Sequence, residues 1–372
     1  MPTPPPISAA ITESSRPRRA PPPAASGLLR RFAEPFFANW HSGVVSVLII
    51  IALVLWLPAL VRWTVTGAVW HAENPEVCRT ASGACWAVIP EKYRIMLFGT
   101  YPSDERWRGW LVIGIVVGLS MISGFRRAWS LRLFYAWIGA AFAVLVLMFG
   151  GVFGLAPVGT HAWGGLPLTL LLFVGTVVAG LPLAVLLALG RRSGLPVVRA
   201  MSIAFIELVR GVPLIAVLFM ASVMFPLFVP EHLTVDKLLR AQIGMIAFFA
   251  AYAAEVVRGG LQAIPYGQSE AADAIGLTYW QSARKIILPQ ALRIVIPALM
   301  NDIIRAFKNT TFVSIIGLFD VLGATKAALQ DPRWIAYSSE AYIFVFALYF
   351  SCCFAMSKYS ENIERDLARA GS

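Results

Sequence analysis

The chain has 372 residues, of which 58% are hydrophobic and 14% are charged, and its mean hydropathy is +0.71. These values exclude an ordinary soluble domain and indicate an integral membrane protein. The formal net charge of +11 does not indicate a nucleic-acid partner. The basic residues form short clusters beside apolar runs, and no basic stripe is interleaved with aromatic residues.

The amino terminus is rich in proline, alanine and serine. This composition cannot bury a core, so we expect residues 1–27 to form a disordered tail. The tail does not resemble a cleavable signal, because prolines interrupt its basic region and the first apolar run is too distant. Residues 28–40 have the composition of an interfacial segment that leads into the membrane.

Eight apolar runs follow, and most approach the length of about 20 residues that spans a bilayer as a helix. We therefore predict an all-α integral membrane protein. The predicted spans are 42–61, 109–125, 133–156, 166–190, 211–229, 241–257, 292–318 and 341–357. Gly211 and Pro213 are expected to break the helix at the start of the fifth span.

Lysine and arginine gather in the links on one side of the predicted spans. They are Arg126, Arg127, Arg132, Arg191, Arg192, Arg199, Arg284, Lys285, Arg293, Lys358, Arg365 and Arg369. The positive-inside rule makes this side cytoplasmic, and an even number of spans places both termini on it. The link 62–108 on the other side is also basic, but five acidic residues accompany it.

The same outer link holds Cys78 and Cys85. In an oxidising periplasm these residues could close a small disulfide loop, and two free thiols are an equally good interpretation of the spacing. Cys352 and Cys353 lie in an apolar span and are expected to be inert core residues.

A polar stretch, 266–289, interrupts the apolar runs. Glu270 and Asp273 are expected in the first turn of a short helix, where acids complement the helix dipole. Gly276 is expected to end this helix, because glycine readily adopts the left-handed conformation of a helix stop.

A second short helix is predicted in the same stretch. Thr278 and Gln281 have the spacing of a capping box, which satisfies backbone groups at a helix start. Pro289 is expected to limit how far this helix continues. The stretch is therefore predicted to fold as two helices joined by a tight turn.

The spacing within this stretch resembles the EAA signature of the membrane subunits of bacterial ABC importers. The matching residues are Glu270, Ala271, Ala272, Gly276, Ile286, Leu288 and Pro289. In that family the loop is a cytoplasmic coupling element set into a groove of the ATPase subunit. The resemblance implies that residues 266–289 couple this chain to an ATPase dimer, which would hold ATP and Mg. The alternative is an ordinary connection whose glycine and proline only punctuate helices.

Further motifs are similar to the polar-amino-acid permeases, the group of the histidine and arginine importers. They are ELVRGVPL from Glu207, YAAEVVRGGLQAIPYGQ from Tyr252, LPQALR from Leu288 and KNTT from Lys308. Those relatives have a five-helix type I ABC importer core. The resemblance implies such a permease core at 158–372, preceded by an N-terminal membrane extension, 28–157, with three spans and a periplasmic loop. An extension of this kind resembles the M-type permease of a general L-amino-acid importer.

Ionisable residues in the seventh span are candidates for a substrate site, because charges inside a membrane usually face a partner, a cavity or a solute. A zwitterionic amino acid needs a cation and an acceptor, which Lys308 and either Asp302 or Asn309 could supply. The resemblance places Lys308 and its followers up to Thr310 in a substrate region, and Asn309 stands where relatives commonly have aspartate. This departure suits neutral or broad substrates. The alternative is an internal ion pair of Asp302 with Arg305 or Lys308 that only fixes packing.

Four charged residues lie near span ends in the motifs similar to the family, namely Glu207, Arg210, Glu255 and Arg258. Their predicted roles are gating or pairing between subunits. The alternative is a set of interfacial charges that reach into lipid headgroups.

The sequence lacks a phosphate-binding P-loop motif and the motifs of common hydrolases, and its four histidines lack metal-ligand spacing. We therefore predict a non-catalytic permease subunit of the bacterial inner membrane, without a cofactor or metal of its own. Expected partners are a second permease in a heterodimer, the ATPase dimer, a periplasmic amino-acid-binding protein and membrane lipid. The alternatives are a membrane-embedded enzyme and an autonomous ion-coupled carrier, whose two related halves the sequence does not show.

Overall fold

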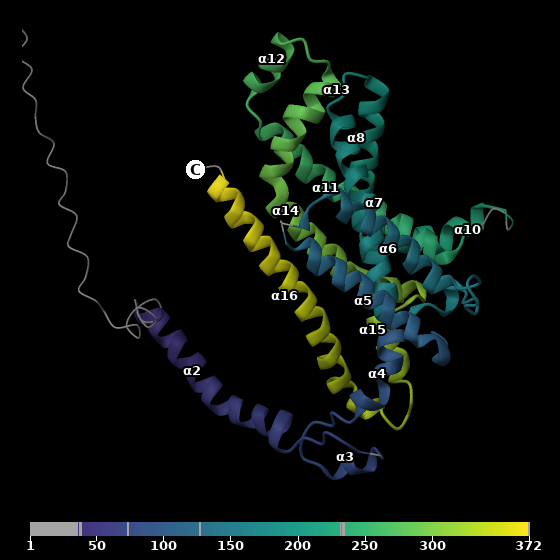
Figure 1. Ribbon diagram of the computed structural model, residues 1–372. Helices are drawn as coiled ribbons and strands as arrows, with labels where there is room; N and C mark the ends of the chain where they lie inside the picture. Colours follow the sequence, from purple (N-terminus) through teal and green to yellow (C-terminus); the bar gives the residue numbers. More distant parts are fainter. Residues whose placement is uncertain are drawn as a thin grey trace, which may run out of the picture. The chain divides into compact units, whose positions relative to one another are not determined.

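The computed structural model describes residues 36, 39–72, 74–125, 128–230, 232 and 235–370, which are mostly helical (Figure 1). The predicted disordered tail, 1–27, lies outside the described residues. The chain divides into two compact units after Gly67.

The first unit consists of one long helix. Helix α2 runs over Trp40–Val61 and continues as a π-helical turn over Arg62–Thr66. At its start, the backbone N–H of Asn39 donates to Ser42 Oγ at 3.1 Å. No residue of α2 is buried. A helix that is apolar on all sides is suited to lipid or to a partner helix, and the first predicted span is confirmed.

The second unit contains the remaining described helices. They are α3 (Glu76–Thr80), α4 (Val88–Phe98), α5 (Arg106–Ser123), α6 (Leu131–Phe149), α7 (Gly165–Arg191), α8 (Pro196–Arg210), α9 (Leu214–Phe219), α10 (Phe225–Phe228), α11 (Lys237–Ala263), α12 (Tyr266–Ala274), α13 (Tyr279–Ser282), α14 (Leu288–Asn309), α15 (Val321–Ala328) and α16 (Ser338–Ala370). Seven helical segments of the described chain are long and apolar enough to cross a membrane, and a bent pair makes up to eight. The all-α class and the number of spans are confirmed.

The predicted fifth span, 211–229, corresponds to the second arm of the bent pair, and α8 forms the first arm. Helix α8 and the segment Leu214–Phe228 meet at 107°. Gly211 and Pro213 lie at the bend, as expected, because proline lacks the N–H that would continue the helix. A π-helical turn, Met220–Met224, joins α9 to α10 within the second arm.

The third predicted span is too long at its end. Helix α6 stops at Phe149 rather than near Ala156. Gly150 has a φ of 65°, a conformation open to glycine, and its N–H donates to the carbonyl of Val146. The apolar residues that follow therefore form a loop.

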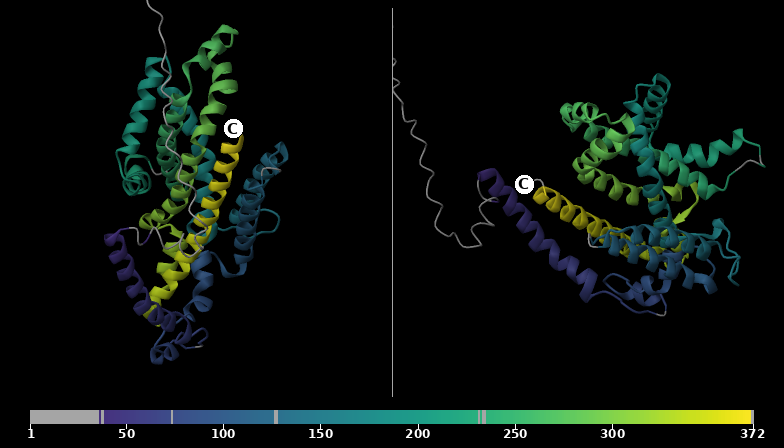
Figure 2. Two further views of the ribbon diagram at one scale, coloured as in Figure 1. Left: turned by 90° about the vertical axis from the view of Figure 1, so that its left-hand side faces the viewer. Right: turned by 45° about the horizontal axis from the view of Figure 1, so that its top comes forward.

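Helices α7 and α11 pack closely because small residues line their contact. Ala184, Ala250 and Ala254 are fully buried there. At Gly180, an added Cβ would lie 2.6 Å from the ring of Phe249, so the backbone approach requires glycine. The hairpin of α12 and α13 stands at one end of this unit, and α4 and α15 lie toward the other (Figures 1 and 2).

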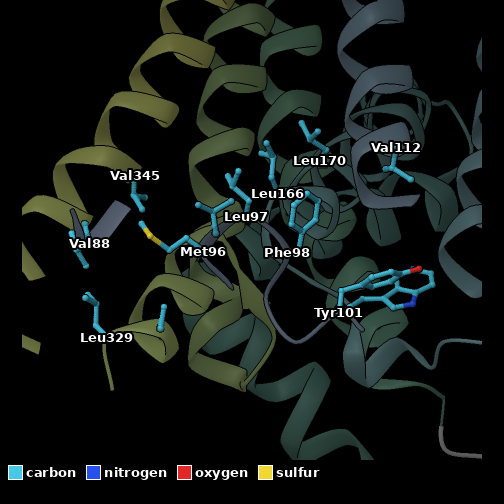
Figure 3. Close-up of a cluster of buried hydrophobic side chains, with 14 of the residues drawn as sticks. Val88, Met96, Leu97, Phe98, Tyr101, Val112, Leu166, Leu170, Leu329 and Val345 are labelled. Carbon is cyan, nitrogen blue, oxygen red and sulfur yellow. The ribbon is translucent and has the colours of Figure 1, made fainter. Parts of the chain in front are cut away.

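A hydrophobic cluster at the end opposite the hairpin joins the predicted extension to the predicted core. Figure 3 shows Met96 and Phe98 of α4 beside Leu166 of α7 and Val345 of α16. A salt bridge also joins these two parts of the chain: Lys92 Nζ of α4 lies 2.9 Å from Asp331 Oδ2. The hydrophobic packing therefore crosses residue 157, where the predicted extension meets the predicted core.

The link that holds Cys78 and Cys85 is also fixed at this end. Cys78 and Cys85 form a disulfide in the structure, with their Cα atoms 5.6 Å apart. The backbone N–H of Cys85 donates to the buried Glu340 Oε1 at 2.8 Å. These bonds fix the link against the start of α16.

A short strand completes this end. Strand β1, Phe319–Asp320, bridges in parallel to Gly164 and Gly165 at the start of α7. Asp320 caps α15, accepting from the backbone N–H groups of Leu322 and Gly323. Burial raises the pKa of the Asp320 carboxyl to about 6, although these donors oppose the shift.

Candidate functional site

The first part of the polar stretch folds as α12. This helix begins at Tyr266, so Glu270 lies in its second turn and the prediction of acids in the first turn is wrong. Pro265, the residue directly before the predicted stretch, stands at the N-cap of this helix. Gly276 has a φ of 75° and ends the helix as predicted.

The second part folds as α13 but does not stop where predicted. The capping box is confirmed, because Gln281 N donates to Thr278 Oγ1 at 3.4 Å and Thr278 N donates to Gln281 Oε1 at 2.9 Å. A π-helical turn, Ala283–Ile287, then leads directly into α14. Pro289 is the second residue of α14, and the π-helical turn before it accommodates its missing N–H, so the expectation that it limits the helix is wrong.

Small residues hold the two parts of this hairpin together. Ala272 is fully buried, and Ser282 and Ala283 are nearly so. Of the other residues of the predicted coupling set, Ile286 and Leu288 are half-buried, while the exposed ones are Glu270, Ala271, Gly276 and Pro289.

The hairpin also exposes large apolar side chains, which we call the coupling surface. They are Tyr266, Ile275, Tyr279 and Trp280, with exposed fractions of 77%, 72%, 55% and 64%. Tyr266, Ile275 and Trp280 were not predicted as site residues, although apolar residues inside a polar stretch are the signal that identifies them. Exposed apolar residues gathered on one element are typical of a protein interface.

The four residues predicted for gating meet at Glu255. Its Oε2 accepts from Arg258 at 2.8 Å and lies 3.6 Å from Arg210 Nη1. Its Oε1 accepts from Arg191 at 2.7 Å, and Arg191 also donates to Glu207 at 3.0 Å. Arg191 belongs to this cluster but was not predicted. Its contact with Glu255 joins the end of α7 to α11, and the sequence does not show that these two helices are adjacent there.

A narrow polar cavity lies between α7, α9, α11 and α14. Its polar lining includes Thr176, Tyr252, Asp302, Arg305 and Asn309. The volume of about 10 Å³ admits roughly one water molecule. In this conformation the cavity is therefore closed to larger solutes.

Asp302 and Arg305 form an ion pair in this cavity, as the packing alternative proposed. One carboxylate oxygen is still available, because Asp302 Oδ2 is buried without a hydrogen-bond partner among the described residues. The Arg305 side chain is 48% exposed. Asp302, Arg305 and Asn309 therefore line one cavity, in which Asp302 keeps one carboxylate oxygen without a partner among the described residues.

The other two predicted substrate residues lie elsewhere. Lys308 is exposed and does not line this cavity. Thr310 is fully buried, and its hydroxyl donates to the carbonyl of Phe307 at 2.7 Å. The structure thus brings together Asp302, Arg305 and Asn309 only.

An aromatic stripe on α11 forms the opposite wall. Met245, Phe248, Phe249 and Tyr252 follow one another at helical spacing and all line the cavity. Sequence reasoning missed this stripe, although the spacing alone marks it. The Tyr252 ring lies between two guanidinium groups, 4.9 Å from that of Arg305 and 5.6 Å from that of Arg210. Tyr252 thereby connects the cavity to the charged cluster at Glu255.

No group of histidine, cysteine and acidic residues in the described part of the chain is arranged to hold a metal ion. The fold and these sites define a polytopic helical membrane protein with an internal polar cavity and an exposed helical hairpin at one end.

The comparisons with known proteins agree with this class. Residues 180–369 match the family model described as binding-protein-dependent transport system inner membrane component. The chain is 44% identical over 335 residues to the inner membrane amino-acid ABC transporter permease protein YhdY of Escherichia coli (strain K12), covering 88% of this chain and 90% of that protein. It is 36% identical over 425 residues to the glutamate/glutamine/aspartate/asparagine transport system permease protein BztC of Rhodobacter capsulatus, covering 96% and 98%.

Among solved structures, the chain is similar to a crystal structure of an amino acid ABC transporter with histidines. The identity is 29%, the TM-score is 0.47, and the match covers 53% of this chain and 90% of that one.

The chain belongs to the family of binding-protein-dependent transport system inner membrane components. The predicted resemblance is confirmed, and so is the interpretation as a non-catalytic permease subunit rather than an enzyme.

Proposed function

We propose that this chain is a permease subunit of an ATP-driven importer that carries a broad range of L-amino acids. The names of the relatives YhdY and BztC support amino acids as the substrate class. The observation that carries the proposal is the cavity lined by Asp302, Arg305 and Asn309, in which Asp302 Oδ2 has no hydrogen-bond partner among the described residues.

The cavity has the chemistry that a zwitterion requires. The α-ammonium of the substrate would bind the unpartnered Oδ2 of Asp302, and the α-carboxylate would bind Arg305. Asn309 adds a neutral donor and acceptor rather than a second charge, which suits side chains of different charge. The aromatic stripe of α11 would contact the substrate side chain.

This assignment moves the cation from Lys308 to Arg305. Lys308 is exposed on α14. Its predicted contact with substrate would belong to a part of the pathway that the second permease completes. The partner would form a heterodimer with this chain, because a single polar cavity of this size does not make a transmembrane pathway.

Transport would require the helices around the cavity to separate, since the cavity now admits roughly one water molecule. Tyr252 and the charged cluster at Glu255 would connect movements of the cavity walls to movements at the hairpin end. Redistribution of the arginine contacts of Glu255 would accompany the change between inward-open and outward-open states.

The force would come from a cytoplasmic ATPase dimer, which holds the ATP and Mg. The hairpin, including Glu270, Ala271, Ala272, Gly276, Ile286, Leu288 and Pro289, would seat in that partner with its coupling surface covered. This assignment makes the hairpin end cytoplasmic, together with both termini. The end that carries the disulfide of Cys78 and Cys85 would be periplasmic and would receive a periplasmic amino-acid-binding protein at the bacterial inner membrane.

Uptake by the reconstituted complex with Arg305→Gln tests the proposal. We expect uptake of every transported amino acid to fall by about tenfold or more, because a hydrogen bond to a charged group contributes about 1.5–3 kcal/mol. Arg293→Gln is the matched control, since Arg293 is an exposed residue of the same helix outside the cavity. Equal uptake by both variants, with the complex assembled, would exclude the cavity as the substrate site.

A further inference from the structure

A second cavity lies at the hairpin end of the second unit, where α7, α8 and α11 meet. Its volume is about 360 Å³, and its lining is Arg191, Arg192, Arg199, Ile203, Arg258 and Gln262. We call it the arginine cavity. Four of its six lining residues carry a fixed positive charge, an arrangement that needs anions to offset the mutual repulsion.

The protein supplies too few anions for these charges. Arg191 and Arg258 share Glu255, and Arg191 also contacts Glu207. Arg192 donates to the carbonyl of Leu261 at 2.9 Å, a neutral partner. Arg199 is exposed, and no carboxylate of the described residues lies within 4.0 Å of it. Two carboxylates therefore face four guanidinium groups, so the arginine cavity retains a net positive charge.

The position of the cavity along the helix axes indicates which kind of anion would reach it. Arg191 is the last residue of α7, a candidate span of 27 residues, and Arg258 lies near the end of α11, another span of 27 residues. Arginines at the ends of membrane spans lie at the depth of lipid headgroups. The arginine cavity therefore lies at the surface of the bilayer.

We propose that the arginine cavity binds the phosphodiester headgroup of an anionic phospholipid. Guanidinium groups match phosphate oxygens in planar, paired hydrogen bonds, and basic pockets between spans are suited to such headgroups. The proposal concerns lipid binding alone and stands whether or not the chain transports amino acids.

Lipid binding to the purified, delipidated full-length protein tests this inference. Native mass spectrometry would compare phosphatidylglycerol with the zwitterionic phosphatidylcholine, and a competition arm would add inorganic phosphate. We expect tighter binding of phosphatidylglycerol, and Arg199→Gln should weaken it about fivefold, the equivalent of about 1 kcal/mol per basic residue near a membrane surface. The double variant Arg192→Gln/Arg199→Gln should weaken it further.

Two variants control for charge and folding. Arg132→Gln removes one positive charge from the start of α6, outside the arginine cavity, and should leave phosphatidylglycerol binding unchanged. Arg199→Lys keeps the charge but not the planar fork, so its affinity should lie between those of wild type and Arg199→Gln. The inference is overturned if Arg199→Gln and Arg132→Gln bind alike, or if wild type binds both lipids equally. Displacement of the lipid by millimolar inorganic phosphate would identify a free-phosphate site instead.

Discussion

Tyr252 connects the two charged sites of this permease through the faces of its ring. The ring lies 4.9 Å from the Arg305 guanidinium and 5.6 Å from that of Arg210, and the hydroxyl donates to the Arg210 carbonyl. A cation facing an aromatic ring contributes about 0.5–2 kcal/mol, depending on solvation. The ring is therefore more important to this connection than the hydroxyl.

This difference gives a matched pair of variants. Tyr252→Leu removes both ring contacts, and we expect amino-acid uptake by the assembled complex to fall by about fivefold. Tyr252→Phe keeps the ring and should retain most of the uptake. If Tyr252→Phe is as defective as Tyr252→Leu, the hydroxyl rather than the ring carries the connection.

Asp320 gives the fold a dependence on pH. It is fully buried, bonded to the Tyr349 hydroxyl at 3.2 Å, and its pKa is about 6. Because this pKa is raised above 3.8, protonation favours the folded state. The associated stability is complete below a pH of about 4 and is lost as the pH rises through about 6. Its size is at most about 3 kcal/mol.

Thermal denaturation of the purified chain between about pH 4.5 and about pH 7.5 checks this dependence. Wild type should lose stability across this range relative to Asp320→Asn, which is neutral and keeps an acceptor. Asp331→Asn is the control variant. Arg333 and Lys92 lower the pKa of Asp331, so its carboxyl does not titrate in this range and the variant should keep the pH profile of wild type. Parallel pH profiles for wild type and Asp320→Asn would contradict the assignment.

Helices α11 and α14 approach each other through Gly260. A Cβ at this position would lie 2.6 Å from Val295 Cγ1 and 2.7 Å from the Ala291 carbonyl oxygen, while nothing lies within 4 Å of a Cβ at the neighbouring Gly259. Since a backbone carbonyl cannot move aside, Gly260→Ala should lower stability by about 1–3 kcal/mol. Gly259→Ala should be neutral or stabilising. Equal melting temperatures for the two variants would show that the helices adjust freely.

The hairpin depends on the left-handed conformation of Gly276. Nothing lies within 4 Å of a Cβ added at Gly276 or at Gly267, so the two glycines differ in backbone conformation alone. Gly276→Ala should destabilise the hairpin by about 1–2 kcal/mol, while Gly267→Ala, within α12, should not. Hydrogen exchange of residues 266–289 measures the difference. Unchanged exchange in Gly276→Ala would mean that the turn is not strained.

The local features of the hairpin were predictable because they depend on neighbouring residues. The capping box of Thr278 and Gln281 and the stop at Gly276 are set by sequence within one turn. The continuation through Pro289 was not predictable, because a π-helical turn accommodates it. Arg191 was missed for another reason, since its bond to Glu255 joins residues 64 positions apart.

Composition and apolar length predicted the class and number of spans, because both follow from the solvent around the helices. The cavity was predicted in part. Asp302 and Asn309 were identified from their charge or polarity inside a span, but which cation faces them depends on the rotation of α14, which the sequence does not state. Arg305 lines the cavity and Lys308, three residues later, does not.

The second unit has two distinct ends. One end holds the disulfide, β1 and the hydrophobic cluster that ties α4 to α15 and α16. The other holds the hairpin, whose coupling surface is uncovered in the chain alone. We propose that a cytoplasmic ATPase covers it.

Labelling of Ile275→Cys with a membrane-impermeant thiol reagent tests this claim most directly. Ile275 is 72% exposed on the coupling surface, and the chain without the substitution gives the background from the native cysteines. We predict no specific labelling in intact cells, labelling after permeabilisation when the ATPase is absent, and protection when the ATPase is assembled. Labelling in intact cells, or labelling that the assembled ATPase does not reduce, would contradict the account.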